Sequence, residues 1–172
     1  MLLQIITTPN PILLTKAKPL TKEGILRLKT QKFIVDLIET MYKSDGVGLA
    51  APQVSESIQI CVIAKNFTMK QEKDLILINP IVKKKSLLKE WGDEGCLSVP
   101  NIFGKVKRYK KIIVEAQNEK GERIKFTASE FPARVIQHEV DHLNGILFIE
   151  KAKGLYKVEK KDLLSPPCEG GE

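Results

Sequence analysis

The sequence predicts an α+β domain in which antiparallel strands pack around a central helix that carries a His-Glu-x-x-His pattern. Three observations support this fold class. Apolar residues recur at helical spacing near both ends of the chain, short β-rich runs lie between these segments, and two of the runs have the spacing of a hairpin. The length of 172 residues is that of one domain, able to bury roughly two thirds of its unfolded surface.

We predict this single domain over residues 1–164. The remaining segment, residues 165–172, contains two prolines, two glycines and two glutamates and offers no apolar residue worth burying. Such a composition favours a disordered tail.

The first predicted element is an amphipathic helix from about Thr21 to Lys43. Apolar residues recur in it at steps of three and four: Ile25, Leu28, Ile34, Leu37, Ile38 and Met41. Thr21 is suited to capping its start, and Ser44-Asp45-Gly46 is suited to ending it.

Strands are expected next, at residues 58–64 and 75–82. A second pair, residues 111–116 and 123–127, flanks Asn118-Glu119-Lys120-Gly121 and is a clear hairpin signal. A second helix then begins after Ser129, with Pro132 in its first turn and Gly145 at its end. Residues 146–149 can form a last short strand or a packed extension.

Composition narrows the choice of environment and partners. No apolar run approaches the ~20 residues that span a bilayer, and the start lacks the basic leader of a signal peptide, so we expect a cytoplasmic protein. Three cysteines at unrelated spacings fit a reducing compartment. The net charge of +7 comes with only 6% aromatic residues, which do not alternate with the lysines, so base-stacking platforms are not expected. Attraction to a polyanion such as the ribosome remains open.

The second helix contains the only two histidines. His138 and His142 lie four residues apart, so both imidazoles face the same side and can bind one metal ion. Glu139 is where a general base belongs in this pattern. The ordinary alternative is a surface helix that happens to carry two histidines.

A metal site needs a third protein ligand. One class of zinc protease places a third His where this chain has Phe148, which excludes that class. A carboxylate from Glu150, Glu159 or Asp162 would define another class, although the last two lie in a lysine-rich segment. The competing ligand is the thiolate of Cys96.

The block Gly46-Val47-Gly48-Leu49-Ala50-Ala51-Pro52-Gln53 formally matches a dinucleotide fingerprint. That fingerprint must follow a strand and open a helix, whereas this block follows a helix and meets a proline. We interpret it instead as a loop whose glycines let a peptide ligand approach the backbone.

Three separated blocks together carry a family resemblance. The Gly46–Gln53 block, Glu94-Gly95-Cys96-Leu97-Ser98 and His138-Glu139-Val140-Asp141-His142 resemble the three signature motifs of the peptide deformylases, in the same order and at similar separations. The resemblance covers roughly residues 1–155. Leu14, Tyr109 and Glu130 depart from the commonest form, where a basic residue, Pro and Gly are usual.

The resemblance implies a metal-dependent enzyme that hydrolyses the N-terminal formyl group of formylmethionyl nascent polypeptides and releases formate. It implies Cys96, His138 and His142 as ligands of one Fe²⁺, with Zn²⁺, Ni²⁺ or Co²⁺ as substitutes. Glu139 would be the general base. The side-chain amide of Gln53 and the backbone N–H of Leu97 would stabilise the oxyanion.

The substrate side of the predicted site is formed by backbone and apolar groups. Phe131 and Val135 share a helix face with the ligands and can wall a pocket for a methionine side chain, although core packing also explains them. The resemblance adds contacts from residues 46–48 to the peptide backbone. Glu94 is assigned to the same side, and Glu94 or Asp141 could orient a histidine.

The predicted partners are nascent formylmethionyl peptides, with the ribosome as a further candidate and neither a membrane nor a sequence-specific nucleic acid. Two alternatives remain at this point. A small metalloendopeptidase would share His138, Glu139 and His142 but use a carboxylate as third ligand. A basic ribosome-associated module would hold a structural metal.

Overall fold

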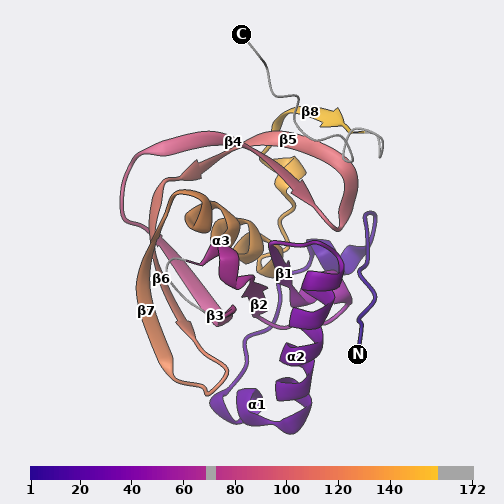
Figure 1. Ribbon diagram of the computed structural model, residues 1–172, viewed down its shortest axis with the longest axis vertical. Coiled ribbons are helices and arrows are strands. Elements are labelled where there is room, and N and C mark those ends of the chain that lie inside the picture. The colour runs from indigo at the N-terminus through magenta and orange to yellow at the C-terminus, as the bar shows by residue number, and fades with distance from the viewer. Residues whose placement is uncertain (69–72, 159–172) are drawn as a thin grey trace.

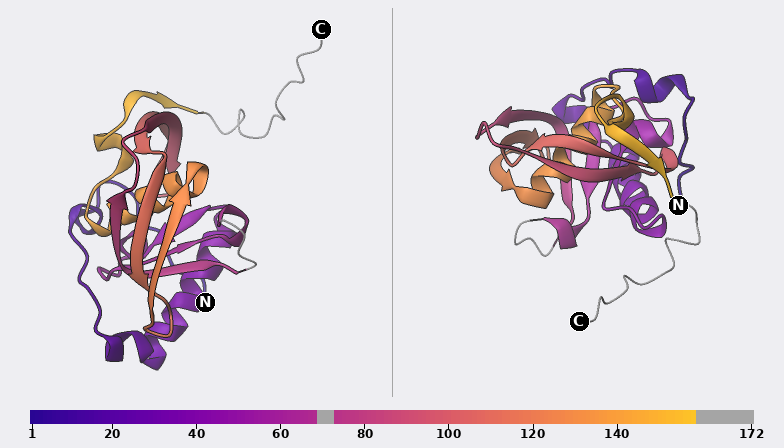
Figure 2. Two further views of the ribbon diagram at one scale, coloured as in Figure 1. Left: turned by 90° about the vertical axis from the view of Figure 1, so that its left-hand side faces the viewer. Right: turned by 90° about the horizontal axis from the view of Figure 1, so that it is seen from above.

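The computed structural model describes residues 1–68 and 73–158. These residues form two antiparallel sheets with the third helix, α3 (Glu130–Leu143), between them, as Figures 1 and 2 show. The predicted α+β class with strands around a central helix is therefore confirmed. The predicted tail, residues 165–172, lies outside the described residues, as does the end of the predicted domain.

The larger sheet has the strand order β1-β2-β3-β6-β7. Its members are β1 (Gly48–Ala50), β2 (Ile60–Ile63), β3 (Leu75–Lys84), β6 (Lys111–Gln117) and β7 (Arg123–Ser129). The hairpin predicted around residues 118–121 is the β6–β7 pair. The apolar side of α3 packs on this sheet through Ala133, Val135 and Ile136.

The smaller sheet has the order β4-β5-β8 and covers the other side of α3 (Figure 1). It consists of β4 (Lys89–Cys96), β5 (Val99–Tyr109) and β8 (Lys153–Lys157). The β4–β5 hairpin is paired from Lys89↔Tyr109 to Cys96↔Val99. A separate apolar cluster, which includes Val99, Val106 and Phe148, lies beneath it.

The prediction of one continuous helix from Thr21 to Lys43 was wrong. The segment is divided into α1 (Lys22–Leu26) and α2 (Leu28–Lys43) by an extended Arg27. Thr30 Oγ1 donates to the Gly24 carbonyl and Gln31 Nε2 donates to the Ile25 carbonyl, so side chains satisfy the groups that a continuous helix would pair. Leu28 is 85% exposed, which shows that its apolar spacing was fortuitous.

The predicted helix boundaries were more accurate. Thr21 accepts a hydrogen bond from the Gly24 N–H, Ser44 ends α2, and Gly145 follows α3 at φ +72°. Ser129 stands before α3, but its side chain makes no capping hydrogen bond to the helix.

Of the two forms expected for residues 146–149, the structure has the packed extension. Residues 148–150 form a 3-10 turn that buries Phe148 rather than a strand, and β8 follows later. Across the described ranges, no helix has both the length and the apolar character needed to cross a membrane.

Candidate active site

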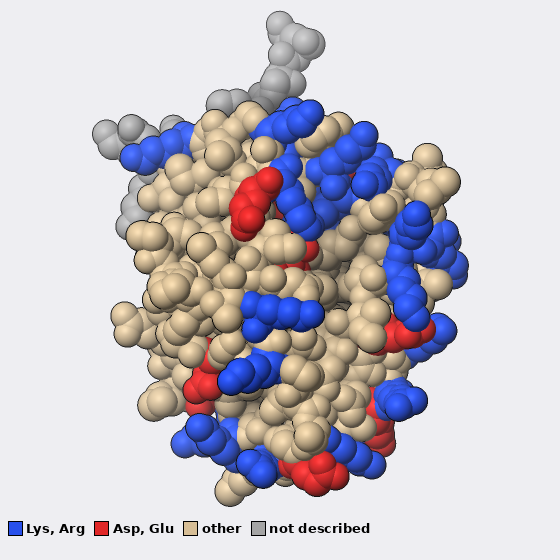
Figure 3. Space-filling model, turned by 180° about the vertical axis from the view of Figure 1, so that it is seen from behind, with Lys and Arg blue, Asp and Glu red and all other residues tan. Residues whose placement is uncertain are grey.

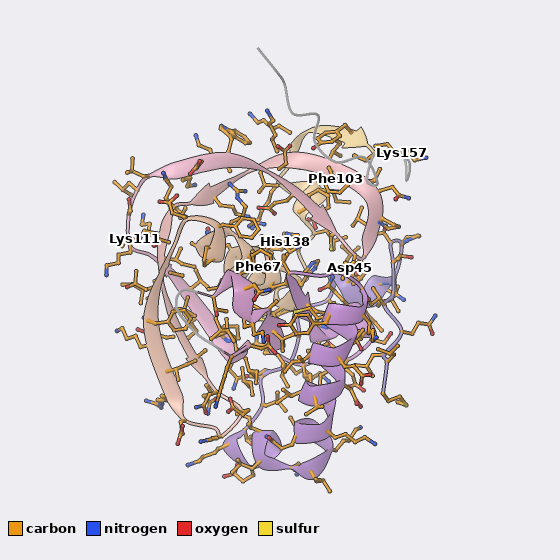
Figure 4. All side chains as sticks on the ribbon, viewed as in Figure 1. Asp45, Phe67, Phe103, Lys111, His138 and Lys157 are labelled. Atoms are coloured by element: carbon orange, nitrogen blue, oxygen red, sulfur yellow. The ribbon has the colours of Figure 1, made fainter. Side chains whose placement is uncertain are left out.

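Three ligand groups converge where α3 faces the tip of the β4–β5 hairpin. His138 and His142 lie one turn apart on α3, and their Nε2 atoms are 3.2 Å from each other. Cys96 ends β4, and its Sγ is 3.2 Å from His142 Nε2. The three ligand atoms all lie within 4.8 Å of one another. In Figure 4, His138 lies in the middle of the molecule, below Phe103.

This donor set fits a divalent metal ion. Ligand atoms on a tetrahedral ion with bonds of about 2.0–2.3 Å are separated by roughly 3.3–3.7 Å, close to the spacing here. Burial lowers the pKa of His142 well below its usual range, so its imidazole is neutral and can bind a metal. Thiolate and imidazole are also the ligand types that borderline transition metals prefer.

The surroundings of His138 also fit a bound metal cation. Burial alone would lower its pKa, but hydrogen bonds to Cys96 and Glu94 outweigh burial and raise the pKa to about 10. The environment of this imidazole therefore stabilises positive charge, which a metal cation would supply in place of the proton.

Glu94 holds His138 in position. Its Oε2 accepts from His138 Nδ1 at 2.9 Å and from Arg108 Nη2 at 2.8 Å, while Oε1 accepts from Arg108 Nε at 2.9 Å and Arg134 Nη1 at 2.8 Å. Burial would raise the pKa of Glu94, but its bonds to Arg108 and His138 hold it at about 2. With Nδ1 donating to this carboxylate, Nε2 of His138 faces the ligand cluster.

Asp141, the other candidate for orienting a histidine, has different partners. Its carboxylate pairs with Arg108 and with Lys151, at 2.6 and 2.7 Å from the Lys151 Nζ. The lysine partner agrees with the alternative that Asp141 is a paired helix residue. Asp141 nevertheless joins α3 to β5 through the same arginine that binds Glu94.

Glu139 is buried beside the ligand cluster and lies against Gly48 of β1. A Cβ atom at Gly48 would be 2.5 Å from Glu139 Oε1, so only glycine leaves space for the carboxylate. Burial raises the pKa of Glu139 to about 7. Glu139 Oε2 has no hydrogen-bond partner among the residues that the structure describes. Such a carboxyl can accept and return a proton near neutral pH.

Gln53 approaches the cluster from the 3-10 turn after β1. Its Oε1 accepts from the Ala50 N–H at 2.9 Å, which leaves Nε2 to point to Cys96 Sγ at 3.4 Å and Ser98 Oγ at 3.3 Å. Leu97 lies in the tight turn between β4 and β5, next to the same sulfur. The structure thus brings the Gln53 amide to the ligand cluster and places Leu97 beside it in the cavity lining.

These groups open into one cavity of about 350 Å³. Every residue predicted for the substrate side lines it: Gly46, Val47, Gly48, Glu94, Phe131 and Val135. Val135 is buried, whereas Phe131 is 47% exposed and packs on Phe67. The four hydrogen bonds that Glu94 accepts from Arg108, Arg134 and His138 show that its carboxylate is already satisfied, which favours positioning over direct substrate contact.

The carboxylates considered as third ligands lie elsewhere. Glu150 Oε1 accepts from the Leu147 N–H at 2.8 Å, as part of its own turn. Glu159 and Asp162 are outside the described residues. In the described ranges, Cys96 with the two histidines is the group of three whose geometry could hold an ion.

Sequence reasoning missed several members of the site. Arg108, Arg134, Ser98 and Phe103 come from the hairpin or from α3 and were not singled out. The composition of β4 and β5 did not mark these residues, and Glu94 meets Arg108 because the two strands pair as one hairpin.

Comparison with known proteins agrees with this geometry. Residues 2–158 match the profile of the family described as polypeptide deformylase. A peptide deformylase of Vibrio vulnificus is 44% identical over 149 residues, which are 86% of this chain and 84% of that protein. One from Desulfotalea psychrophila is 40% identical over 96% of this chain and 98% of its own.

Solved structures give the same result. The crystal structure of the Thermotoga maritima peptide deformylase superposes with a TM-score of 0.81 at 39% identity, covering 90% of this chain and 99% of that one. A class I type b enzyme from Acinetobacter baumannii, with Met-Ala-Ser bound, gives 0.82 at 33% identity, covering 88% and 98%.

Proposed function

This chain belongs to the peptide deformylase family, which removes the N-formyl group from nascent peptides, and from that premise we propose how its own residues carry out the reaction. The observation that supports the assignment best is the convergence of Cys96, His138 and His142 beside a buried Glu139. The alternative of a metalloendopeptidase is not favoured, because among the described residues the group placed with the two histidines is the Cys96 thiol and not a carboxylate.

Cys96, His138 and His142 would hold the metal on which the family depends. When bound, the ion supplies Lewis acidity, which makes a water molecule acidic enough to lose its proton near neutral pH. Glu94 keeps the His138 ring in the ligating tautomer through Nδ1, and Arg108 keeps Glu94 charged.

Glu139 is the proton carrier. It accepts the proton of the attacking water and returns it to the leaving nitrogen when the C–N bond of the formamide breaks. The products are formate and a free N-terminal amine. Burial against Gly48 raises its pKa to about 7, so both its protonation states are accessible at neutral pH.

Gln53 and Leu97 stabilise the negative charge that develops on the formyl oxygen. The Gln53 amide is oriented in advance, because its oxygen is bound to the Ala50 N–H and its nitrogen faces Cys96. A preorganised donor of this kind typically contributes about 3–4 kcal/mol to transition-state stabilisation.

The cavity supplies substrate selectivity. We assign the apolar side, with Val135 and Phe131, to the methionine side chain, and residues 46–48 to the peptide backbone. The A. baumannii relative binds Met-Ala-Ser, which supports a peptide running from this pocket.

Fe²⁺ is our proposed ion, one per chain, with Zn²⁺, Ni²⁺ or Co²⁺ as substitutes, because one thiolate and two imidazoles accept all four. An iron-bound thiolate would be open to oxidation. Peroxide treatment of iron-loaded protein should therefore place sulfinic acid on Cys96, mapped by mass spectrometry, before it reaches the fully buried Cys61. Oxidation of Cys61 first, or equal damage in nickel-loaded protein, would contradict iron.

We also propose a cytoplasmic enzyme that associates weakly with ribosomes. Lys and Arg side chains gather at the upper right of the face shown in Figure 3, at the end of the molecule that holds β4 and β5. The exposed lysines of β4 and β5 include Lys89, Lys105 and Lys107. Co-sedimentation with ribosomes that disappears with added salt would support this association.

Formate release from formyl-Met-Ala by the purified metal-loaded protein tests the assignment. We expect formate in proportion to free Met-Ala, and no cleavage of an unformylated peptide. A Cys96→Asp variant should lose most activity, because the third ligand is the thiolate. Internal cleavage without formate, retained in Cys96→Asp, would instead establish an endopeptidase.

A further inference from the structure

We propose that Arg134 limits the length of the side chain that the active-site pocket accepts, by closing this pocket off from a second cavity beside it. The inference rests on the proposed function, because it takes the apolar side of the pocket to hold the first side chain of the substrate.

The two cavities lie one after the other between β4 and α3. Along β4, the active-site cavity is lined by residues 93–96 and the second cavity, of about 310 Å³, by residues 90–92. Along α3, the first extends to Glu139 and the second to Glu130. Phe131 and Arg134 line both, so these two side chains stand at the boundary between the cavities.

Arg134 crosses from α3 to the hairpin at this boundary. Its Nη2 donates to the Glu90 carbonyl at 3.0 Å, and its Nη1 donates to the Val106 carbonyl at 2.9 Å and to Glu94 Oε1 at 2.8 Å. Only 12% of the side chain is exposed. A guanidinium bound to the backbone of both hairpin strands is a fixed wall rather than a surface side chain that can swing aside.

The opposite wall leaves space for this guanidinium at Gly92. A Cβ atom there would lie 2.8 Å from Arg134 Cζ and Nη2. The Arg134 guanidinium, which comes from α3, therefore fills the volume that a side chain at position 92 of β4 would occupy. This complementarity means that a larger residue at position 92 can take over the wall if Arg134 is removed.

The boundary lies one helical turn from the part of α3 that holds the ligand cluster. Arg134 lies four residues before His138, which is about 6 Å along the helix axis. An unbranched chain of four heavy atoms fits this length, and a longer one meets the guanidinium. Without the guanidinium, a longer chain would continue toward Trp91 and Tyr109 in the second cavity.

The experiment measures kcat/KM on formyl-X-Ala peptides in which X is norleucine, which has the length of methionine, or 2-aminooctanoate, which is two methylenes longer. We expect the metal-loaded wild-type protein to prefer norleucine. Replacing Arg134 with Ala should raise the ratio of 2-aminooctanoate to norleucine about tenfold, the effect of burying two more methylenes. Most of the change in the ratio should be in KM, because lost support for Glu94 affects both peptides alike.

Two further variants separate the wall from the support that Arg134 gives to Glu94. Arg134→Lys should keep the wild-type ratio, because its long side chain still fills the boundary. The double variant Gly92→Ile with Arg134→Ala should restore the preference for norleucine, although it lacks the same bond to Glu94. A general loss of activity affects both substrates and cancels in the ratio.

An unchanged ratio in a folded Arg134→Ala protein that still hydrolyses the norleucine peptide would overturn the inference. Equal use of both peptides by the wild-type protein would overturn it without any variant, which covers the case in which Arg134→Ala fails to fold. Absence of formate from every peptide would instead refute the deformylase function.

Discussion

The two walls of the active site are built on different physical principles. The α3 wall places His138, Glu139 and His142 on adjacent turns of one helix, so its geometry follows from local spacing. The hairpin wall places Glu94, Cys96 and Arg108 on two strands, and its geometry depends on register and on a buried ionic network. In the proposed mechanism the helix wall supplies the proton carrier and two of the ligands, whereas the hairpin wall supplies the third ligand, Cys96, and the charged groups that keep His138 aligned.

This difference teaches where each kind of mutation should act. Changes on the helix wall should alter turnover with little effect on folding, because the side chains face the cavity. Changes to the hairpin network should alter stability and metal affinity first, because a buried charge that loses its partner is costly.

Glu139→Gln should have the largest effect on turnover and would sharpen the contrast between the helix wall and the hairpin wall. The amide cannot accept the proton of the attacking water, so we expect kcat to fall by about 10²–10⁴-fold. Metal content, measured by mass spectrometry of the purified protein, and melting temperature should stay near wild type. A fully metallated variant that turns over at close to the normal rate would remove Glu139 from its proposed role.

Arg108→Met should give the largest loss of stability. It leaves Glu94 and Asp141 without their shared cation, and we expect the free energy of unfolding in urea to fall by about 3–5 kcal/mol. Lys107→Met is the matched control, since Lys107 is exposed on the same strand and should change stability by less than about 0.5 kcal/mol. Equal losses in the two variants would break the distinction between the walls.

Glu94→Gln should act mainly on the metal. The neutral amide is a weaker acceptor for His138 Nδ1, so we expect metal affinity to fall by about 10–100-fold in a competition titration with a chelator. Glu90→Gln, a change of the same charge on an exposed residue of β4, should leave affinity unaltered. If both variants bound metal like the wild type, Glu94 would not be a positioning residue.

The smallest expected effect concerns the start of α3. Glu130 has φ +55°, in the left-handed region that favours glycine, and it stands where the family commonly has Gly. Glu130→Gly should therefore stabilise the protein by about 1 kcal/mol, seen as a higher midpoint in urea. Lys32→Gly, in the exposed middle of α2, should do the opposite by a similar amount. Destabilisation by Glu130→Gly would show that the side chain compensates for its backbone strain.

The sequence could predict the features that depend on local spacing, as on the helix wall, better than those that depend on strand register, as on the hairpin wall. The C-terminal ends of α2 and α3, the β6–β7 hairpin and the alignment of His138 with His142 depend on residues close in the chain. The break at Arg27 depends on hydrogen bonds from Thr30 and Gln31 to carbonyls that a continuous helix would have used. Apolar periodicity carries no information about such competition.

Most of the hairpin wall could not be predicted from the sequence, for another reason. β4 and β5 carry many lysines, glutamates and glycines, so neither run has the composition of a buried strand. Their buried charged residues are Glu94 and Arg108, which are stable there because each is paired with groups of opposite charge. Only the family motif around Cys96 pointed to this region.

The contact between Gly48 and Glu139 has a consequence for how this protein can evolve. Because a single added carbon at position 48 would occupy the place of the carboxylate, two motifs that are 91 residues apart in the sequence are tied by one steric exclusion. In a library randomised at position 48, survivors should all be glycine or should carry compensating changes around α3. The neighbouring Val47, which lines the open side of the cavity, should accept several aliphatic residues in the same selection. Adaptation to new inhibitors or substrates should therefore proceed through position 47 while position 48 stays invariant.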